Sequence, residues 1–479
     1  MNAAGVDCIA TDKARPCLFV LPVNDAFLVC NPPAGVASLV NGPALHRLRR
    51  AVGQVPSAPS YPSLSDDLHQ LAVLLAQKPE APPAATGPLH PLFLGLLPTR
   101  SCNIRCAYCD FGADGPQAAA MSPALASAAL TWYARFLEEA GHGRMEVHFF
   151  GGEPFVAREV VETAVHRSRL LADRHGLALH LEVSTNGVFE PEYAQFVGDY
   201  FQAVVLSLDG FQEVHDRHRP ARAGRGSFAQ ARQTAALLAR TPTELCLRCC
   251  VSTLNVHRLE EIALWFCKEF QPSAINFEPL TGNSSTLAAG LLPPDPYLFA
   301  RQYAKAHAQT LRHGVKPVYA ATEGEPSRTS FCPVGKDALI VSADGRISSC
   351  YLPQEAWLER GLDLDVGRLD AQGHLRIDTD AIVRLRRLPE DKPRCARCFC
   401  QWVCSGGCHV HHTYPGSPLA YEPFCIQTRL LSACRLLEEM GLGSVAETLL
   451  DDRQAMEALA QRPSDLFEDL PENPMPEAA

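Results

Sequence analysis

In Cys102-Asn-Ile-Arg-Cys106-Ala-Tyr-Cys109, three cysteines share one short loop at C-x3-C-x2-C spacing. Three thiolates can hold three irons of a cubane cluster and leave the fourth iron open. Zinc prefers four ligands, commonly from C-x2-C pairs, so this spacing suits zinc poorly. The loop therefore predicts a [4Fe–4S] cluster, and its open iron is a place where a small molecule can be held and reduced.

The composition around this loop is that of a globular protein of several domains. The chain has 479 residues, 47% of them apolar and 20% charged, which predicts two to four domains. Its net charge of −10 disfavours nucleic acid or an anionic membrane as a partner. No apolar run approaches the roughly 18 residues of a membrane span.

The N-terminal residues Met1–Cys8 have neither a basic nor an apolar region typical of a signal peptide. We therefore expect a cytoplasmic protein. Nineteen cysteines in such a chain point to metal or redox chemistry instead of a disulfide framework.

From about residue 91 the pattern alternates between short apolar runs and helical spacing. One helix is predicted to open at Ser122-Pro123, a cap followed by proline, and another follows His257. The strand candidates are Leu92–Leu97, Met145–Phe150, Ala178–Val183, Ala203–Leu208, Leu245–Val251 and Ala274–Leu280. Six strands alternating with helices predict parallel βα units, arranged either as an open sheet or as a partial barrel.

The polar motifs follow these strands in order. The cysteine loop follows the first strand, Gly151-Gly152-Glu153-Pro154 the second and Ser184-Thr185-Asn186-Gly187 the third, while Ser207-Leu208-Asp209-Gly210 ends the fourth. Each glycine turn alone is a weak signal. Since βα folds place their chemistry at the carboxyl ends of strands, the series predicts one shared site.

A second set of seven cysteines lies downstream, and four of its members occupy a C-x2-C-x5-C-x3-C run. The seven are Cys332, Cys350, Cys395, Cys398, Cys404, Cys408 and Cys425. A closing helix is expected after Cys425. The tail from Pro463 is rich in Pro, Asp and Glu, a composition typical of disorder.

With these motifs, residues 92–430 resemble the radical SAM superfamily, and within it the SPASM-domain peptide maturases. The cysteine loop with Tyr108 matches the family signature, the Gly-Gly-Glu-Pro stretch matches the segment that binds S-adenosylmethionine (SAM), and the seven cysteines match the SPASM pattern. The resemblance implies a partial (β/α)6 TIM-like barrel over 92–320 and a SPASM domain with its closing helix over 321–445. Residues 446–479 would form a C-terminal helix and the acidic tail.

The resemblance also implies three [4Fe–4S] clusters. Cys102, Cys106 and Cys109 would hold the SAM-binding cluster. One auxiliary cluster would take Cys395, Cys398, Cys404 and Cys425. The other would take Cys332, Cys350 and Cys408, with either an open iron or a spare ligand such as Cys400.

The SAM contacts implied by the family are Tyr108, Gly151, Gly152, Glu153, Ser184, Asn186 and Arg219. Glu153 would face the SAM ammonium, a charge-assisted contact, and would be catalytic together with the loop cysteines. Ser184 could instead cap a helix, and Arg219 could be a surface or helix-end charge. Asp209 is either a turn residue or a substrate contact.

Further cysteines and histidines are expected to be structural. Cys246, Cys249, Cys250 and Cys267 fall in core segments, where free cysteine is common. His409, His411 and His412 are expected on a solvated loop, because the family does not use them as ligands.

Residues 1–78 form a separate small unit in this interpretation, followed by a Pro/Ala-rich linker over 79–91. Strands are predicted at Cys17–Leu21, Ala26–Cys30 and Val36–Val40, with two helical stretches after them. The pattern resembles PqqD-like domains, which would bind a leader peptide by strand addition. The alternative is a structural cap on the barrel.

The favoured function is a radical SAM enzyme that modifies a peptide or protein by an intrapeptide thioether or C–C cross-link, with an external flavodoxin- or ferredoxin-type donor. A sulfatase maturase is a weaker alternative, since Tyr351 stands where that branch places an aspartate and Ala338 where it has a further cysteine. A non-catalytic metal-binding module is the alternative from another class.

Overall fold

The computed structural model describes residues 17–52, 65–77, 91, 93–111, 120–222, 224, 226–282, 284–322, 328, 330–332, 334, 338–388, 392–412, 421–461 and 465–466. The predicted linker apart from residue 91, and the tail from Pro463 apart from residues 465–466, lie outside these residues. Residues 465–466 form a short strand, so the expectation of disorder is wrong for them.

Seven parallel strands in sequential order form the centre of the molecule. They are β4 (Leu94–Leu96), β5 (Arg144–Phe149), β6 (Ala178–Thr185), β7 (Ala203–Ser207), β8 (Glu244–Val251), β9 (Ala274–Pro279) and β10 (Lys316–Val318). β4–β9 are the six predicted strands. The βα units of the predicted barrel are confirmed, and the sheet stays open because β10 forms one of its edges.

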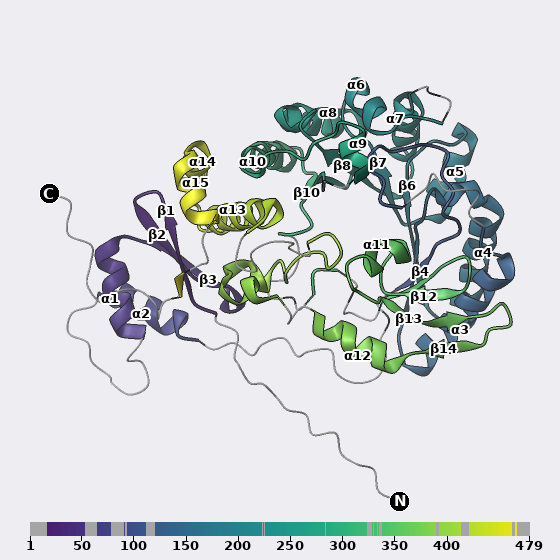
Figure 1. The fold of residues 1–479 in the computed structure, drawn as a ribbon, viewed down its shortest axis with the longest axis horizontal. Helices are drawn as coiled ribbons and strands as arrows, with labels where there is room; N and C mark the ends of the chain where they lie inside the picture. Colours follow the sequence, from purple (N-terminus) through teal and green to yellow (C-terminus); the bar gives the residue numbers. More distant parts are fainter. Residues whose placement is uncertain are drawn as a thin grey trace, which may run out of the picture.

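Helices connect these strands and surround them in Figure 1. They are α3 (Pro123–Glu139), α4 (Arg158–His175), α5 (Pro191–Tyr200), α6 (Gln212–His218), α7 (Phe228–Leu238), α8 (Leu259–Phe270), α9 (Ser284–Ala288) and α10 (Pro296–Arg312), with 3₁₀ turns at Pro154–Ala157 and Val256–Arg258. α3 begins as predicted, since the Ser122 side chain accepts a hydrogen bond from Leu125 N (3.1 Å) and Pro123 follows.

The downstream cysteine region extends the same sheet at its other edge. β11 (Leu339–Val341) pairs in parallel with β4, and β12 (Arg346–Ser348), β13 (Asp365–Leu369) and β14 (Leu375–Ile377) follow as an antiparallel series. Its other elements are α11 (Gln354–Leu358), α12 (Thr379–Arg387), 3₁₀ turns at Pro393–Arg397 and Phe399–Trp402, and the helices α13 (Pro423–Glu439), α14 (Gly443–Asp451) and α15 (Arg453–Ala460).

The N-terminal unit contains the predicted strands β1 (Phe19–Val23), β2 (Ala26–Asn31) and β3 (Val36–Val40), a 3₁₀ turn at Pro32–Ala34, and helices α1 (Gly42–Val52) and α2 (Asp66–Leu75). β15 (Asp465–Leu466) pairs with β1, so the sheet order is β15-β1-β2-β3. The far end of the chain thereby covers the β1 edge, while no described strand pairs with the outer edge of β3.

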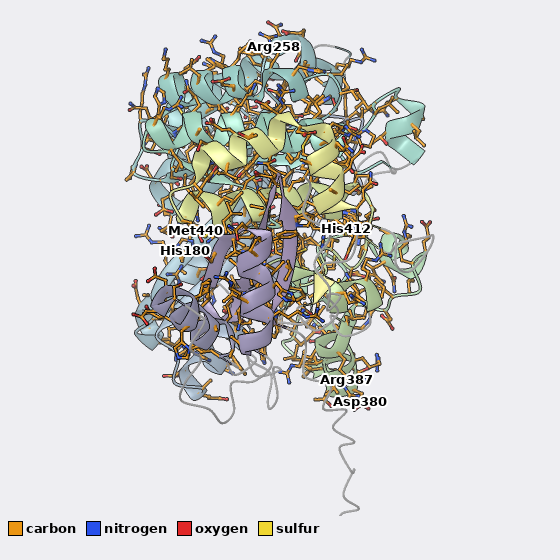
Figure 2. The ribbon with its side chains drawn as sticks, turned by 90° about the vertical axis from the view of Figure 1, so that its left-hand side faces the viewer. His180, Arg258, Asp380, Arg387, His412 and Met440 are labelled. Atoms are coloured by element: carbon orange, nitrogen blue, oxygen red, sulfur yellow. The ribbon has the colours of Figure 1, made fainter. Side chains whose placement is uncertain are left out.

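The N-terminal sheet has two buried faces. Val20 and Val29 pack with α1 and α2 in a small core of their own. Phe19 and Leu21 belong to the main core, which also contains Leu437 of α13. Figure 2 shows this unit in front of the yellow C-terminal helices, and Figure 1 shows the same neighbours at the left. The unit is therefore packed against the C-terminal helices.

Candidate active site and cysteine centres

The cysteine loop after β4 is held by the segment that follows α6. Arg105 N donates to Pro220 O (2.8 Å), and Ala107 N donates to the carbonyl oxygen of His218 (2.8 Å). Arg222 Nε donates to Cys102 O (2.7 Å). These contacts fix the backbone between the cysteines, so the three thiols need little ordering to receive a ligand.

The glycine pair after β5 packs directly against the segment that enters the cysteine loop. Gly152 N donates to Thr99 O (3.1 Å) and Glu153 N donates to Ser101 O (2.9 Å). A Cβ atom on Gly152 would lie 2.3 Å from the carbonyl oxygens of Arg100 and Ser101. Glycine is required here because two backbones approach each other closely.

Glu153 is buried at the base of this loop. Its carboxylate accepts hydrogen bonds from Phe155 N (3.2 Å), Thr185 Oγ1 (2.9 Å) and Asn186 N (2.8 Å). Burial outweighs these donors and raises the pKa of Glu153 to about 7. A carboxylate offers about four acceptor positions, so one remains for a ligand cation such as an ammonium.

The Ser-Thr-Asn-Gly segment at the carboxyl end of β6 reaches the cysteine loop through Asn186. Its Nδ2 donates to Asn103 Oδ1 (2.8 Å) and lies 3.5 Å from Cys102 Sγ. Ser184 lines the cavity in front of the loop. The structure thus brings both predicted residues to the site, and Asn186 also helps to hold the loop.

Asp209 is the centre of a buried polar network at the end of β7. Its Oδ2 accepts from Tyr108 Oη (2.8 Å) and Arg219 Nε (2.8 Å) and contacts His218 Nδ1 (3.2 Å), while Oδ1 accepts from Cys250 N (2.9 Å). Burial alone would raise the pKa of Asp209, but Arg219 and His218 hold it well below its usual range. Neither predicted role, turn residue or substrate contact, describes this carboxylate.

Through this network Arg219 is placed beside the cysteine loop. Its guanidinium lies 5.2 Å from the Tyr108 ring centroid and 3.7 Å from Cys106 Sγ. Its side chain is 9% exposed, so it is not a surface charge. The contributions of Asp209 and His218 could not be predicted from sequence, because their partners come from three separate segments.

One cavity of about 720 Å³ joins these groups. Its wall includes the three loop cysteines and, from the cysteine-rich region, Cys408, His411 and His412. The remaining predicted SAM contacts that line it are Tyr108, Gly151, Gly152, Ser184, Asn186 and Arg219. Glu153 lies behind this wall, directly next to Gly152.

The thiols of Cys102 and Cys106 are protonated unless a metal displaces their protons. Burial raises the pKa of Cys102 to about 11 and that of Cys106 to about 12. Thiolate ligation by iron releases such protons, since a bound cation stabilises the anionic sulfur. A set of soft sulfur donors on an ordered loop therefore fits an iron–sulfur cluster.

A first group of downstream cysteines surrounds a small pocket under α13. Cys395, Cys398, Cys404 and Cys425 line it together with Cys400. Arg429 Nη1 donates to Cys398 Sγ (3.3 Å). A hydrogen bond from Cys400, with Arg429 acting against burial, lowers the pKa of Cys398 to about 6. The four cysteines of the predicted auxiliary set are brought together, with Cys400 as a fifth thiol.

A second group consists of Cys332, Cys350 and Cys408. Burial, with the nearby charges of the other two sulfurs, raises the pKa of Cys350 to about 12. The Lys392 ammonium lies between the two groups, donating to Gly406 O (2.8 Å), and its pKa is lowered by burial. The structure thus separates the seven cysteines into the two predicted sets.

The prediction of a solvated histidine loop is wrong for two of its members. His409 and His412 are only 5% and 8% exposed. The His412 ring stacks on Phe424 with centroids 3.7 Å apart. His411 is partly exposed at the cavity wall. Burial of a polar ring depends on tertiary packing, which sequence spacing did not reveal.

Tyr351 occupies an apolar position. Its ring lies 6.2 Å from Phe93 and 4.8 Å from Phe150, and it packs in a cluster with Ile340. It does not line the cavity. Cys249 and Cys267 are core residues as expected, whereas Cys250 lines the cavity next to Tyr108.

Among the described residues, no three His, Cys, Asp or Glu side chains are placed to share a single metal ion. No described helix is both long and apolar enough to cross a bilayer.

Comparison with known proteins places this geometry in context. The family model of the radical SAM superfamily matches residues 96–265. A serine-type anaerobic sulfatase-maturating enzyme of Klebsiella aerogenes is 24% identical over 384 residues, covering 73% of this chain and 86% of the relative. A PqqA peptide cyclase of Xanthomonas axonopodis pv. citri (strain 306) is 24% identical over 393 residues, covering 79% of this chain and 98% of the relative.

Solved structures share the fold. Native anSMEcpe with bound AdoMet has a TM-score of 0.57 at 20% identity, covering 74% of this chain and 99% of that chain. Streptococcus suis SuiB bound to S-adenosylmethionine has a TM-score of 0.52 at 14% identity, covering 84% of this chain and 97% of that chain. At these identities the likeness concerns the fold.

Proposed function

Because the chain is a radical SAM enzyme, with that domain over residues 96–265, we propose that it modifies a peptide or protein substrate through a 5′-deoxyadenosyl radical. The proposed product is an intrapeptide thioether or C–C cross-link. Relatives named as a peptide cyclase and as sulfatase-maturating enzymes support a peptide substrate.

The observation that carries this proposal is the single cavity between the two cysteine regions. It is lined by Cys102, Cys106 and Cys109 on one side and by Cys408 on the other. At about 720 Å³ it lies within the range of about 300–1,000 Å³ of ligand sites. SAM and one substrate side chain can therefore meet next to both cluster sites.

When bound, the SAM cluster would supply the electron that splits SAM and yields the radical. The chain positions SAM for this chemistry. Gly151 and Gly152 present backbone to the cavity, and Glu153 provides next to them a buried carboxyl group that a bound ammonium would hold in its ionised form. Ser184 and Asn186 offer further polar groups at the cavity, and Tyr108 and Arg219 lie beside Cys106.

The two downstream sets would hold the auxiliary clusters. Removal of a substrate hydrogen atom followed by S–C or C–C bond formation releases a proton and one surplus electron. The auxiliary sites are placed to accept that electron because Cys408 shares the substrate cavity. An external flavodoxin- or ferredoxin-type protein would deliver the first electron, in a reducing cytoplasm that keeps the thiols free.

The N-terminal unit is proposed to bind a leader peptide at β3. A groove of about 710 Å³ runs along Gly35–Asn41 and is completed by Leu68, Leu71 and Leu74 of α2. β15 already occupies the opposite edge of the sheet. Addition of a strand at β3 would supply backbone hydrogen bonds, and the α2 leucines would contact apolar leader side chains.

Formylglycine formation is the second candidate, and the sulfatase-maturating relatives fit it equally well. The position of Tyr351 favours the first proposal, since an aromatic ring in an apolar cluster supplies no base at the cavity. The non-catalytic module is disfavoured by the polar wall that the barrel strands contribute to the same cavity.

The test uses anaerobically reconstituted enzyme, reductant, SAM and each short peptide found in the reading frames adjacent to this chain's gene. We expect 5′-deoxyadenosine and a peptide lighter by two hydrogen atoms per cross-link. A sulfatase-derived peptide should keep its mass. Formylglycine in that peptide would support the second candidate, and tightly bound zinc without 5′-deoxyadenosine would support the module.

A further inference from the structure

The site formed by Cys332, Cys350 and Cys408 has three cysteines for a cluster of four irons. The sulfurs of Cys332 and Cys408 are near enough to influence the pKa of Cys350. The other auxiliary set has four cysteines, with Cys400 next to them in the same pocket, so Cys400 is located at the wrong site to complete this one. A fourth ligand must come from another residue type or from outside the chain.

His411 lies directly beside this site. Its backbone N–H donates to Cys408 Sγ (3.4 Å), and its imidazole is within hydrogen-bonding reach of the same thiol. Its ring also lines the cavity shared with the loop cysteines. Imidazole is a common ligand of iron.

The other side of the imidazole is fixed by Asp110. His411 Nε2 lies 3.1 Å from Asp110 Oδ2, and Asp110 directly follows Cys109. Histidines that bind metals almost always donate the second ring N–H to a carboxylate or carbonyl, which sets the tautomer. With Nε2 held by Asp110, Nδ1 is the ring nitrogen that remains on the side of the Cys408 thiol and its site.

Resting on the proposed function, we propose that His411 Nδ1 is the fourth ligand of the cluster held by Cys332, Cys350 and Cys408, with Asp110 as its carboxylate partner. This cluster then has no open iron for a substrate thiolate. It serves as an electron acceptor, and the Asp110–His411 pair joins its ligand shell to the loop of the SAM-binding cluster.

The two neighbouring histidines are placed differently. His412 Nδ1 accepts the Cys408 N–H (2.9 Å), so its proton lies on Nε2 and neither nitrogen is free for iron. Among the described residues, His409 Nε2 is buried without a hydrogen-bond partner, so His409 is the competing candidate, but its ring does not border the cavity. Both residues serve as matched controls.

The test uses the full-length chain with Cys102, Cys106 and Cys109 changed to alanine, so that only auxiliary clusters contribute. After anaerobic reconstitution we expect about eight irons per chain, four per cluster. Pulsed EPR of the reduced protein should detect a strongly coupled ¹⁴N nucleus. His411→Gln should abolish the coupling, whereas His412→Gln and His409→Gln should keep it.

The His411→Cys variant distinguishes the loss of a nitrogen ligand from a folding defect. It should keep about eight irons, because thiolate replaces imidazole, and should lose the nitrogen coupling. Coupling that survives in His411→Gln and disappears in His409→Gln would overturn the assignment. If the triple-alanine protein binds about eight irons but shows no nitrogen coupling, His411 is not a ligand and the proposed function is unaffected. If it binds no iron, the auxiliary clusters of the proposed function are rejected as well.

Discussion

Asp209 organises the cysteine loop from behind. Its carboxylate accepts hydrogen bonds from Tyr108, Arg219 and the backbone N–H of Cys250. The Arg219 guanidinium also contacts Cys106 Sγ. The buried Arg219 guanidinium therefore lies next to Cys106, a proposed cluster ligand, and forms an ion pair with Asp209. An iron–sulfur cluster with thiolate ligands is anionic, so a fixed positive charge at this position would stabilise it.

Asp209→Asn should destabilise the protein strongly, because it leaves the Arg219 guanidinium buried without a counter-charge. Breaking a buried ion pair in this way costs about 3–5 kcal/mol. Tyr108→Phe removes one hydrogen bond to the same carboxylate and should cost about 1 kcal/mol. Anaerobic urea unfolding of the apoprotein measures both. Equal, small losses in the free energy of unfolding of the two variants would mean that the Asp209–Arg219 ion pair contributes little to stability.

Glu153 predicts a pH dependence of stability in the apoprotein. Its pKa is raised from 4.5 to about 7 by burial. Between these values the folded state keeps a proton that the unfolded state has lost, so stability falls as pH rises, by about 1.4 kcal/mol per pH unit. Glu153→Gln should remove this contribution. Parallel pH profiles of the two proteins would contradict the predicted state of Glu153.

At the scale of elements, the site depends on the contact between two loops. Gly152 packs on the carbonyl oxygens of Arg100 and Ser101, so any side chain there separates the loops. Gly152→Ala should lower the iron content by about four per chain, the contents of one cluster, and should abolish SAM binding. Gly143→Ala, where a Cβ meets nothing within 4 Å, is the control. Full iron content and SAM affinity in Gly152→Ala would contradict this geometry.

The leader groove offers an adjacent pair of exposed residues for a test. Leu74 lines the groove and is 38% exposed, while Val73 is 46% exposed and lies outside it. Leu74→Lys should weaken binding of the precursor peptide at least tenfold, about 1.4 kcal/mol, and Val73→Lys should leave it unchanged. Isothermal titration calorimetry provides the dissociation constants. Equal affinity in both variants would place the leader elsewhere.

At the scale of the whole molecule, the regions predicted as separate domains share one sheet and one core. β11 of the cysteine-rich region pairs with β4, and Phe19 of the N-terminal unit is buried in the same core as Leu437. The proposed leader site is thus fixed relative to the cavity through α13–α15. If the leader of a precursor peptide is held at β3, the segment to be modified starts from a fixed position relative to the cavity.

The sequence predicted the elements with strong local signals. β4–β9 and β1–β3 are bounded by turn residues and are rich in apolar side chains. β10–β12 and β14 have three residues each, which is too short to show alternation. The sequence analysis did not predict these strands or the longer β13, and so it did not predict the pairing of β11 with β4 that joins the two regions.

The site was predictable where motifs follow parallel strands, because the carboxyl ends of such strands meet at one edge. The loop cysteines and Ser184 share a cavity for this reason. The network around Asp209 and the burial of His412 were not predictable, since both depend on contacts between distant segments.

The most direct test of the account concerns the loop cysteines. Anaerobic, reconstituted enzyme with reductant and SAM should release 5′-deoxyadenosine, whereas the variant with Cys102, Cys106 and Cys109 changed to alanine should release none and should lose about four of about twelve irons. A triple variant that retains the iron and cleaves SAM at the parent rate would contradict the assignment of this loop as the SAM-splitting centre.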